Sequence, residues 1–304
     1  MQAIYQNGGC KMLKVDGLNK TFYGFSLKNI DLHIPKGYIC GLIGENGAGK
    51  STLIKTIIGL YKMEEGSVVV DGMKFDSNEA QIKDMLGIVL DECIYNPGYT
   101  PLKIGKLYGP LYTHYEESAY LDWLKKFNVP ADKKIKQLSK GMQIKFQLAF
   151  ALSHKAKLFI FDEPTAGLDS DFRKEFLDIC MELIEDGERS ILFSTHITED
   201  LDRVADYITF IQDGEILLSM TKEELCSRFV YVQAENYKLK LLKPTSVVHR
   251  EEGTYGGSAL VVNSKQVPLD NDYEKRVPTV EEVMYYFVKG GKAHAKDIIE
   301  LYVK

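Results

Sequence analysis

The residues best suited to chemistry form a glycine-rich run, GENGAGKS, over positions 44–51. This run matches every fixed position of the phosphate-binding pattern G-x-x-x-x-G-K-[ST]. Glycines let such a loop close around a polyphosphate with its N–H groups pointing inward. Lys50 would set its ammonium against the β- and γ-phosphates, and the Ser51 hydroxyl would coordinate Mg²⁺. We therefore expect a site for a nucleoside triphosphate and Mg²⁺ formed by Gly44, Asn46, Gly47, Gly49, Lys50, Ser51 and Thr52.

A pair of carboxylates follows an unbroken apolar run over positions 158–161. Such a run predicts a strand buried on both faces, so Asp162 and Glu163 would lie at its carboxyl end. Asp162 would hold Mg²⁺, usually through water, and Glu163 would act as a general base toward the attacking water. Taken alone, the same pattern also describes a strand that ends in two surface acids.

Two further motifs surround this pair. Ser139 and Gly141 open a helical pattern, where a hydroxyl and free N–H groups can bind an anion. The same residues would also make an ordinary helix N-cap. His196 closes the next predicted strand, from which its imidazole could reach a γ-phosphate, although a lone histidine is more often structural.

In this order and spacing the motifs resemble the nucleotide-binding domain of ABC ATPases, over about residues 13–228. The resemblance implies that residues 44–51 are the Walker A loop and residues 158–163 the Walker B strand. It also implies that residues 138–142 are the ABC signature and residues 166–169 the D-loop. The catalytic residues implied are Glu163, His196 and Lys50.

The resemblance further implies that Ser139, Gly141 and Asp169 contact nucleotide across a dimer. Tyr23 falls where the family stacks an aromatic ring on adenine, with Phe22 as the neighbouring alternative.

The sequence departs from the family pattern at two places. The signature has Lys140 and Met142 where the commoner form has glycine and glutamine. The loop after the strand at 87–90 has Asp91 and Glu92 where the family usually has a glutamine. A carboxylate accepts hydrogen bonds from water and binds Mg²⁺, but it cannot donate as an amide does. We therefore expect Asp91, or Glu92, to be a metal ligand together with Ser51 and Asp162.

The elements that would position these residues alternate between strands and helices, which predicts an α/β fold with a largely parallel sheet. The fold class expected is the P-loop NTPase of ABC ATPase type: a mixed, largely parallel sheet, an antiparallel β subdomain, a helical subdomain and a small C-terminal α+β extension. The strands expected lie at 13–15, 26–34, 39–43, 67–70, 87–90, 158–161, 191–193, 208–211 and 215–218. The helices expected lie at 52–58, 139–152, 171–184, 197–204 and 222–229, and positions 102–127 are mostly helical in pattern.

We divide the chain of 304 residues into three parts. Residues 1–11 show no periodicity and are expected to be a tail, either disordered or left from an expression vector. Residues 12–228 would form the nucleotide-binding domain, with its helical subdomain at about 92–153. Residues 229–304 would form an accessory extension, in which Thr279 followed by Glu282 predicts a helix start.

Composition limits the partners. The formal net charge of −5 gives no reason to expect nucleic acid. No apolar run approaches the roughly 20 residues of a membrane helix, and the N-terminus has no signal-peptide core, so a cytoplasmic location is expected. Five scattered cysteines indicate reduced thiols.

The resemblance implies an ATPase that pairs head to tail with itself or with a paralogue. It also implies separate integral-membrane permease subunits, so the chain would act peripherally on the cytoplasmic face of the membrane. The Lys-Gly-Met signature and the tyrosine-rich segment are more similar to bacterial ABC-2-type exporters of drugs, antibiotics, peptides or lipid-like substrates than to importers. The alternative is a soluble ABC ATPase with a regulatory, translation or repair role.

Overall fold

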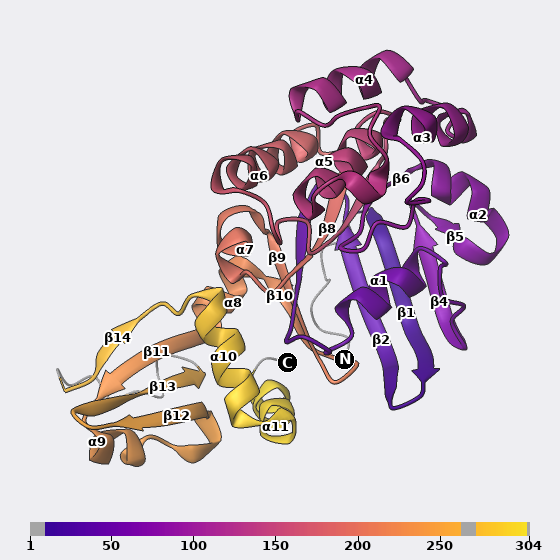
Figure 1. Ribbon diagram of the computed structural model, residues 1–304. Coiled ribbons are helices and arrows are strands. Elements are labelled where there is room, and N and C mark those ends of the chain that lie inside the picture. Colours follow the sequence, from indigo (N-terminus) through magenta and orange to yellow (C-terminus); the bar gives the residue numbers. More distant parts are fainter. Residues whose placement is uncertain (1–9, 263–271, 303–304) are drawn as a thin grey trace.

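A six-stranded sheet forms the centre of the fold, with strands in the order β10-β9-β3-β8-β7-β6 (Figure 1). The computed structural model describes residues 10–262 and 272–302. The pairs β3–β8, β3–β9, β7–β8 and β6–β7 are parallel, and only β10 runs antiparallel to its neighbour β9 in this sheet. The strands are β3 (Ile39–Ile43), β6 (Leu86–Val89), β7 (Leu158–Asp162), β8 (Ser190–Thr195), β9 (Tyr207–Gln212) and β10 (Glu215–Thr221). The expected mixed, largely parallel sheet is confirmed.

A second sheet is antiparallel in the order β2-β1-β4-β5. Its strands are β1 (Lys11–Phe22), β2 (Phe25–Pro35), β4 (Glu65–Val70) and β5 (Met73–Lys74). Strand β1 begins at Lys11, which pairs with Pro35, so the ordered chain includes the last residue assigned to the tail. Residues 1–9 of that tail lie outside the described residues.

Helices connect and cover the strands. They are α1 (Lys50–Ile57), α2 (Phe75–Asp84), α3 (Pro101–Tyr108), α4 (Glu117–Lys126), α5 (Lys140–Ala151), α6 (Ser170–Ile184), α7 (Thr198–Val204) and α8 (Lys222–Arg228). Figure 1 shows α3, α4, α5 and α6 gathered at one end of the molecule, beyond the central sheet. Aromatic side chains fill this region; Tyr120, for example, is buried and donates its hydroxyl to the Pro101 carbonyl at 2.9 Å.

The C-terminal residues form a third, antiparallel sheet in the order β12-β13-β11-β14, with three helices (Figure 1). The elements are β11 (Phe229–Ala234), α9 (Asn236–Leu241), β12 (Val247–Gly253), β13 (Gly256–Val262), β14 (Glu274–Arg276), α10 (Val280–Gly290) and α11 (Lys292–Tyr302). Thr279 caps α10, and its side chain and that of Glu282 form the reciprocal bonds of a capping box, as the sequence predicted.

This C-terminal part packs on the edge of the central sheet. Phe287 on α10 contacts the rings of Phe210 on β9 and Phe229 on β11, at centroid distances of 6.0 and 5.4 Å. Lys292 of α11 forms an ion pair with Glu215 of β10 at 2.7 Å. Among the described residues, no helix is long and apolar enough to cross a membrane.

Candidate active site

The glycine-rich loop joins the end of β3 to the start of α1 and encloses the Lys50 side chain. Lys50 is 5% exposed, and its ammonium donates to the carbonyls of Gly44 at 2.8 Å and Glu45 at 3.4 Å. The ammonium also lies 3.4 Å from a carboxylate oxygen of Glu163. The loop therefore holds a cation at the N-terminus of a helix, where backbone N–H groups and the helix dipole favour phosphate.

Two glycines of this loop have conformations that other residues adopt with strain. Gly47 has a φ of +84° and Gly49 a φ of +110°. A Cβ on Gly49 would lie 2.6 Å from the Phe25 ring, whereas a Cβ on Gly47 would meet nothing within 4 Å. The loop thus packs tightly at Gly49 and is open at Gly47, where a ligand could approach the backbone.

We expect Gly49→Ala to destabilise the nucleotide-free protein more than Gly47→Ala. Backbone strain costs about 1–3 kcal/mol at either position. Overpacking against Phe25 should add about 1–3 kcal/mol at position 49 alone. Urea denaturation measures both variants, and equal losses of unfolding free energy would contradict the packing role of Gly49.

Asp162 lies at the carboxyl end of β7 and is almost fully buried, at 1% exposure. The Ser194 hydroxyl donates to its Oδ1 at 2.6 Å. Burial raises the pKa of Asp162, and the neighbouring carboxylates of Glu163 and Asp91 raise it further, against the lowering effect of hydrogen bonds from Ser194 and Ser51. The negative charges of neighbouring carboxylates are therefore concentrated here, and a divalent cation would reduce the repulsion between them.

Glu163 stands between a lysine and a histidine. Its Oε2 lies 2.7 Å from Nδ1 of His196 and accepts from the His196 backbone N–H at 3.2 Å. Its other oxygen faces Lys50. Glu163 also has a φ of +50°, an uncommon backbone conformation that persists only where its surroundings enforce it. The carboxylate is thus held at the phosphate loop, between the Lys50 ammonium and the His196 ring.

Lys50, Glu163 and His196 line a cavity of about 740 Å³, whereas the buried Asp162 does not line it. Its walls include Asn46, Gly47, Gly49, Lys50, Ser51, Thr52, Glu163 and His196. The volume suits a nucleotide, and the backbone cradle and buried ammonium suit its phosphates. Within residues 10–262 and 272–302, no three His, Cys, Asp or Glu side chains lie close enough to hold a metal alone. Mg²⁺ would therefore need Ser51 and phosphate oxygens beside Asp162.

Comparison with known proteins decides the family. Residues 27–166 match the family model described as ABC transporter. The linearmycin resistance ATP-binding protein LnrL of Bacillus subtilis (strain 168) is 33% identical over 224 residues, which cover 71% of each chain. The chain belongs to the ABC transporter family. It is an ATP-binding subunit and an ATPase.

Similarity extends beyond this domain in one relative. The uncharacterized ABC transporter ATP-binding protein YdbJ of Bacillus subtilis (strain 168) is 28% identical over 305 residues, covering 95% of this chain and 98% of YdbJ. Among solved structures, the ATP-binding cassette MJ0796, a dimer in a post-hydrolysis state bound to ADP and Pi, superposes with a TM-score of 0.63. That cassette is 26% identical and covers 69% of this chain and 98% of its own.

The three contacts expected across a dimer do not line the cavity of this ABC subunit, and neither do Gly44 and Tyr23 of the expected set. Ser139 caps α5 by accepting from the Met142 backbone N–H at 3.2 Å, and Gly141 follows it in the first turn. Asp169 caps α6 by accepting from the Phe172 backbone N–H at 2.9 Å. All three sit at helix N-termini outside their own chain's phosphate site.

The aromatic residue at the cavity differs from our first choice. The Tyr23 side chain is fully exposed and does not line the cavity, whereas Phe22 and Phe25 do. Phe22, the stated alternative, packs edge-on against Tyr61 with ring centroids 5.2 Å apart. An adenine ring entering the described cavity would therefore meet Phe22 before Tyr23.

Asp91 and not Glu92 lines the cavity of the ABC subunit. Its Oδ1 lies 2.5 Å from the ammonium of Lys140. Lys140 and Ala166, which the sequence places in the signature and the D-loop, were not expected to line their own chain's cavity, and Ser194 was not assigned to the site. Ser194 lies two residues before His196 in the motif that carried the histidine, so its position was a usable signal.

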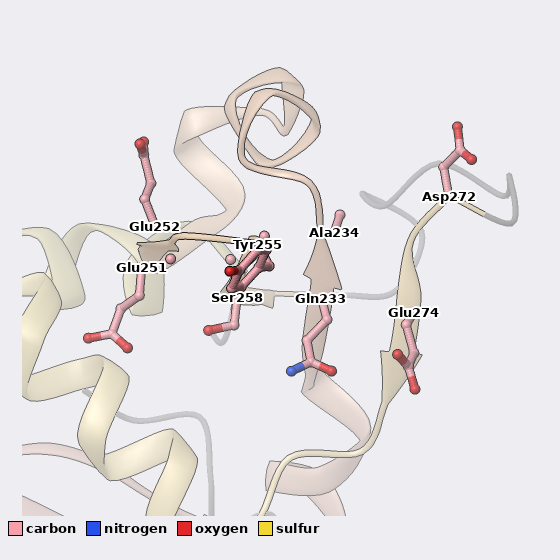
Figure 2. A pocket seen from close by; sticks show the side chains of 11 residues that line it. Gln233, Ala234, Glu251, Glu252, Tyr255, Ser258, Asp272 and Glu274 are labelled. Atoms are coloured by element: carbon pink, nitrogen blue, oxygen red, sulfur yellow. The ribbon is translucent and has the colours of Figure 1, made fainter.

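A second cavity, of about 620 Å³, lies on the C-terminal sheet (Figure 2). Figure 2 shows Glu251 and Glu252 at one side and Asp272 and Glu274 at the other. Two of these carboxylates form ion pairs with lysines: Glu252 with Lys240 at 2.9 Å and Asp272 with Lys238 at 2.7 Å. Among the described residues, the lining of this cavity has four carboxylates and no lysine or arginine, which does not suit a phosphate.

Proposed function

We propose that this ABC subunit hydrolyses ATP to power an exporter of drug, antibiotic, peptide or lipid-like substrates through separate integral-membrane subunits. The observation that carries the proposal is the convergence of Lys50, Glu163 and His196 on one cavity, with the buried Asp162 directly before Glu163. The part of the chain that the structure describes contains no helix that could span a membrane. Two relatives support the substrate class by name: LnrL is a linearmycin resistance protein, and SrtF of Streptococcus pyogenes is a lantibiotic transport protein, 34% identical over 212 residues.

The roles of the residues follow from their positions. Lys50 binds the β- and γ-phosphates from inside the loop. Ser51 and Asp162 would hold Mg²⁺, and the ion would supply positive charge beside the phosphoryl group. Glu163 takes a proton from the attacking water, and His196 orients Glu163 through the 2.7 Å contact.

A second cassette would complete each site. Ser139, Gly141 and Asp169 lie outside their own chain's cavity, at helix N-termini suited to phosphate. We infer that they meet the nucleotide of a partner in a head-to-tail dimer, with a second copy or a paralogue. The dimeric state of the MJ0796 cassette supports this inference.

We assign residues 12–228 to the nucleotide-binding domain and 229–304 to an accessory extension. The ATP sites would lie at the cytoplasmic face of the membrane, next to the permease subunits. The alternative is an ABC ATPase with a regulatory, translation or repair role and no membrane partner. Nothing in the net charge of −5 favours a nucleic acid partner.

Co-purification separates the two functions. A tagged Glu163→Gln variant, expressed in the native cell and extracted with detergent and ATP, should recover a stoichiometric polytopic membrane protein. The variant is used because slow hydrolysis preserves the ATP-bound assembly. Lys50→Ala serves as the control, since loss of ATP binding should reduce the recovery. Recovery with ribosomes or DNA, or with no membrane protein, would overturn the transport proposal.

A further inference from the structure

The two departures from the family's sequence pattern contact each other. Asp91, which replaces the usual glutamine, lies 2.5 Å from Lys140, which replaces a signature glycine. They are 49 positions apart in the sequence, and both line the nucleotide cavity. An acidic residue in this loop is thus matched by a basic residue on the helix that faces it.

The Asp91 carboxylate has a cation beside it in the nucleotide-free cavity. Its Oδ1 is shielded from solvent, and the Lys140 ammonium lies 2.5 Å from this oxygen. The carboxylate is also close enough to Asp162 to act on it electrostatically. Asp91 lines the same cavity as Ser51, an expected Mg²⁺ ligand, and the Lys140 ammonium partly neutralises its charge.

Lys140 is the first residue of α5, directly after its cap Ser139. The next residue, Gly141, packs on the backbone of Gly167, where an added Cβ would lie 3.1 Å from the carbonyl oxygen. The ion pair therefore connects the metal end of the cavity to the helix N-terminus that we assign to a partner's nucleotide.

We propose that Asp91 and Lys140 form a latch that holds the N-terminus of α5 against its own nucleotide cavity and that Mg²⁺–ATP opens. A Mg²⁺ ion on the Asp91 carboxylate would repel the Lys140 ammonium beside it, so the two cations compete for this carboxylate. When Asp91 turns to Mg²⁺, Lys140 is released with the signature residues toward a partner chain. This inference rests on the proposed ATP site and dimer, and it adds a metal-dependent control of the signature.

The strength of the pair is suited to this role. The two side chains are 53% and 41% exposed, and ion pairs of that exposure shift an equilibrium only about two- to fivefold. A divalent cation bound with phosphates outweighs such a pair easily. In the empty site the latch therefore favours the position in which the N-terminus of α5 lies against its own cavity, and it does not prevent ATP from binding.

The test measures how much Mg²⁺ strengthens nucleotide binding. In a Glu163→Gln background, a fluorescent ATP analogue is titrated with Mg²⁺ and again with EDTA, and the ratio of the two dissociation constants is taken. We expect Lys140→Ala to raise this ratio about two- to fivefold, because Asp91 no longer has a competing cation. We expect Asp91→Asn to lower it and to abolish the effect of a second Lys140→Ala substitution.

Two controls isolate the contact. Lys126 pairs with Glu175 at similar exposures, 52% and 39%, so Lys126→Ala should leave the ratio unchanged. Lys140→Arg keeps the charge and should keep the parent ratio. The latch would be overturned, and the proposed function left standing, by either of two results. One is an unchanged ratio in Lys140→Ala; the other is a rise of the same size when Lys140→Ala is introduced into Asp91→Asn. A parent protein that binds no nucleotide would overturn the proposed function as well.

Discussion

Replacing Glu163 with glutamine should lower the rate of ATP hydrolysis about 10²–10⁴-fold while ATP remains bound. Glutamine keeps the shape of the side chain but cannot accept a proton from water, which removes the general base. Nucleotide affinity should persist because Lys50 keeps its bonds to the loop carbonyls of Gly44 and Glu45. Steady-state phosphate release gives the rate, and equilibrium titration with a fluorescent ATP analogue gives the affinity.

The same variant should accumulate as an ATP-dependent dimer, since slow hydrolysis leaves ATP at the interface. Size-exclusion chromatography with and without ATP measures this state. Glu199→Gln is the matched control, because Glu199 is a carboxylate near the same sheet edge with a side chain that is 81% exposed. A Glu163→Gln protein with the turnover of Glu199→Gln would remove Glu163 from the mechanism.

The sequence was sufficient to place the central sheet and the motifs. Strands β3, β7, β8 and β9 are apolar runs bounded by turn residues, which local patterns reveal directly. Helix α2 was not predicted, because only Phe75 and Ile82 among its ten residues are buried and Asn78 departs from helical geometry. A mostly exposed helix with an irregular centre leaves no clear periodicity.

Contacts between residues far apart in the sequence could not be predicted from local patterns. The ion pair of Asp91 and Lys140 depends on how β6 and α5 meet in space, and neither residue has a local pattern that names the other. The choice between Tyr23 and Phe22 depends in the same way on which side chain the hairpin turns toward the cavity. Patterns along the chain predicted each motif, whereas tertiary packing determined which of two neighbouring residues lines the cavity.

Replacing Lys50 with alanine should weaken ATP binding about 10–100-fold. Hydrogen bonds to charged groups are worth about 1.5–3 kcal/mol, and each 1.4 kcal/mol is a factor of ten in affinity. The loop N–H groups and the helix N-terminus would remain, so residual binding is expected. Titration with the fluorescent ATP analogue in EDTA isolates this effect, because the metal then contributes nothing.

Lys50→Ala also leaves Glu163 without the cation that lies 3.4 Å away, and a buried partner lost in this way destabilises the protein. Thermal melting without nucleotide therefore accompanies the titration. Lys55→Ala provides the control: Lys55 lies on the same helix and does not line the cavity. A folded Lys50→Ala protein that binds ATP as tightly as Lys55→Ala would show that the buried ammonium does not face phosphate. The comparison therefore tests the nucleotide site itself, independently of hydrolysis, dimerisation or any membrane partner.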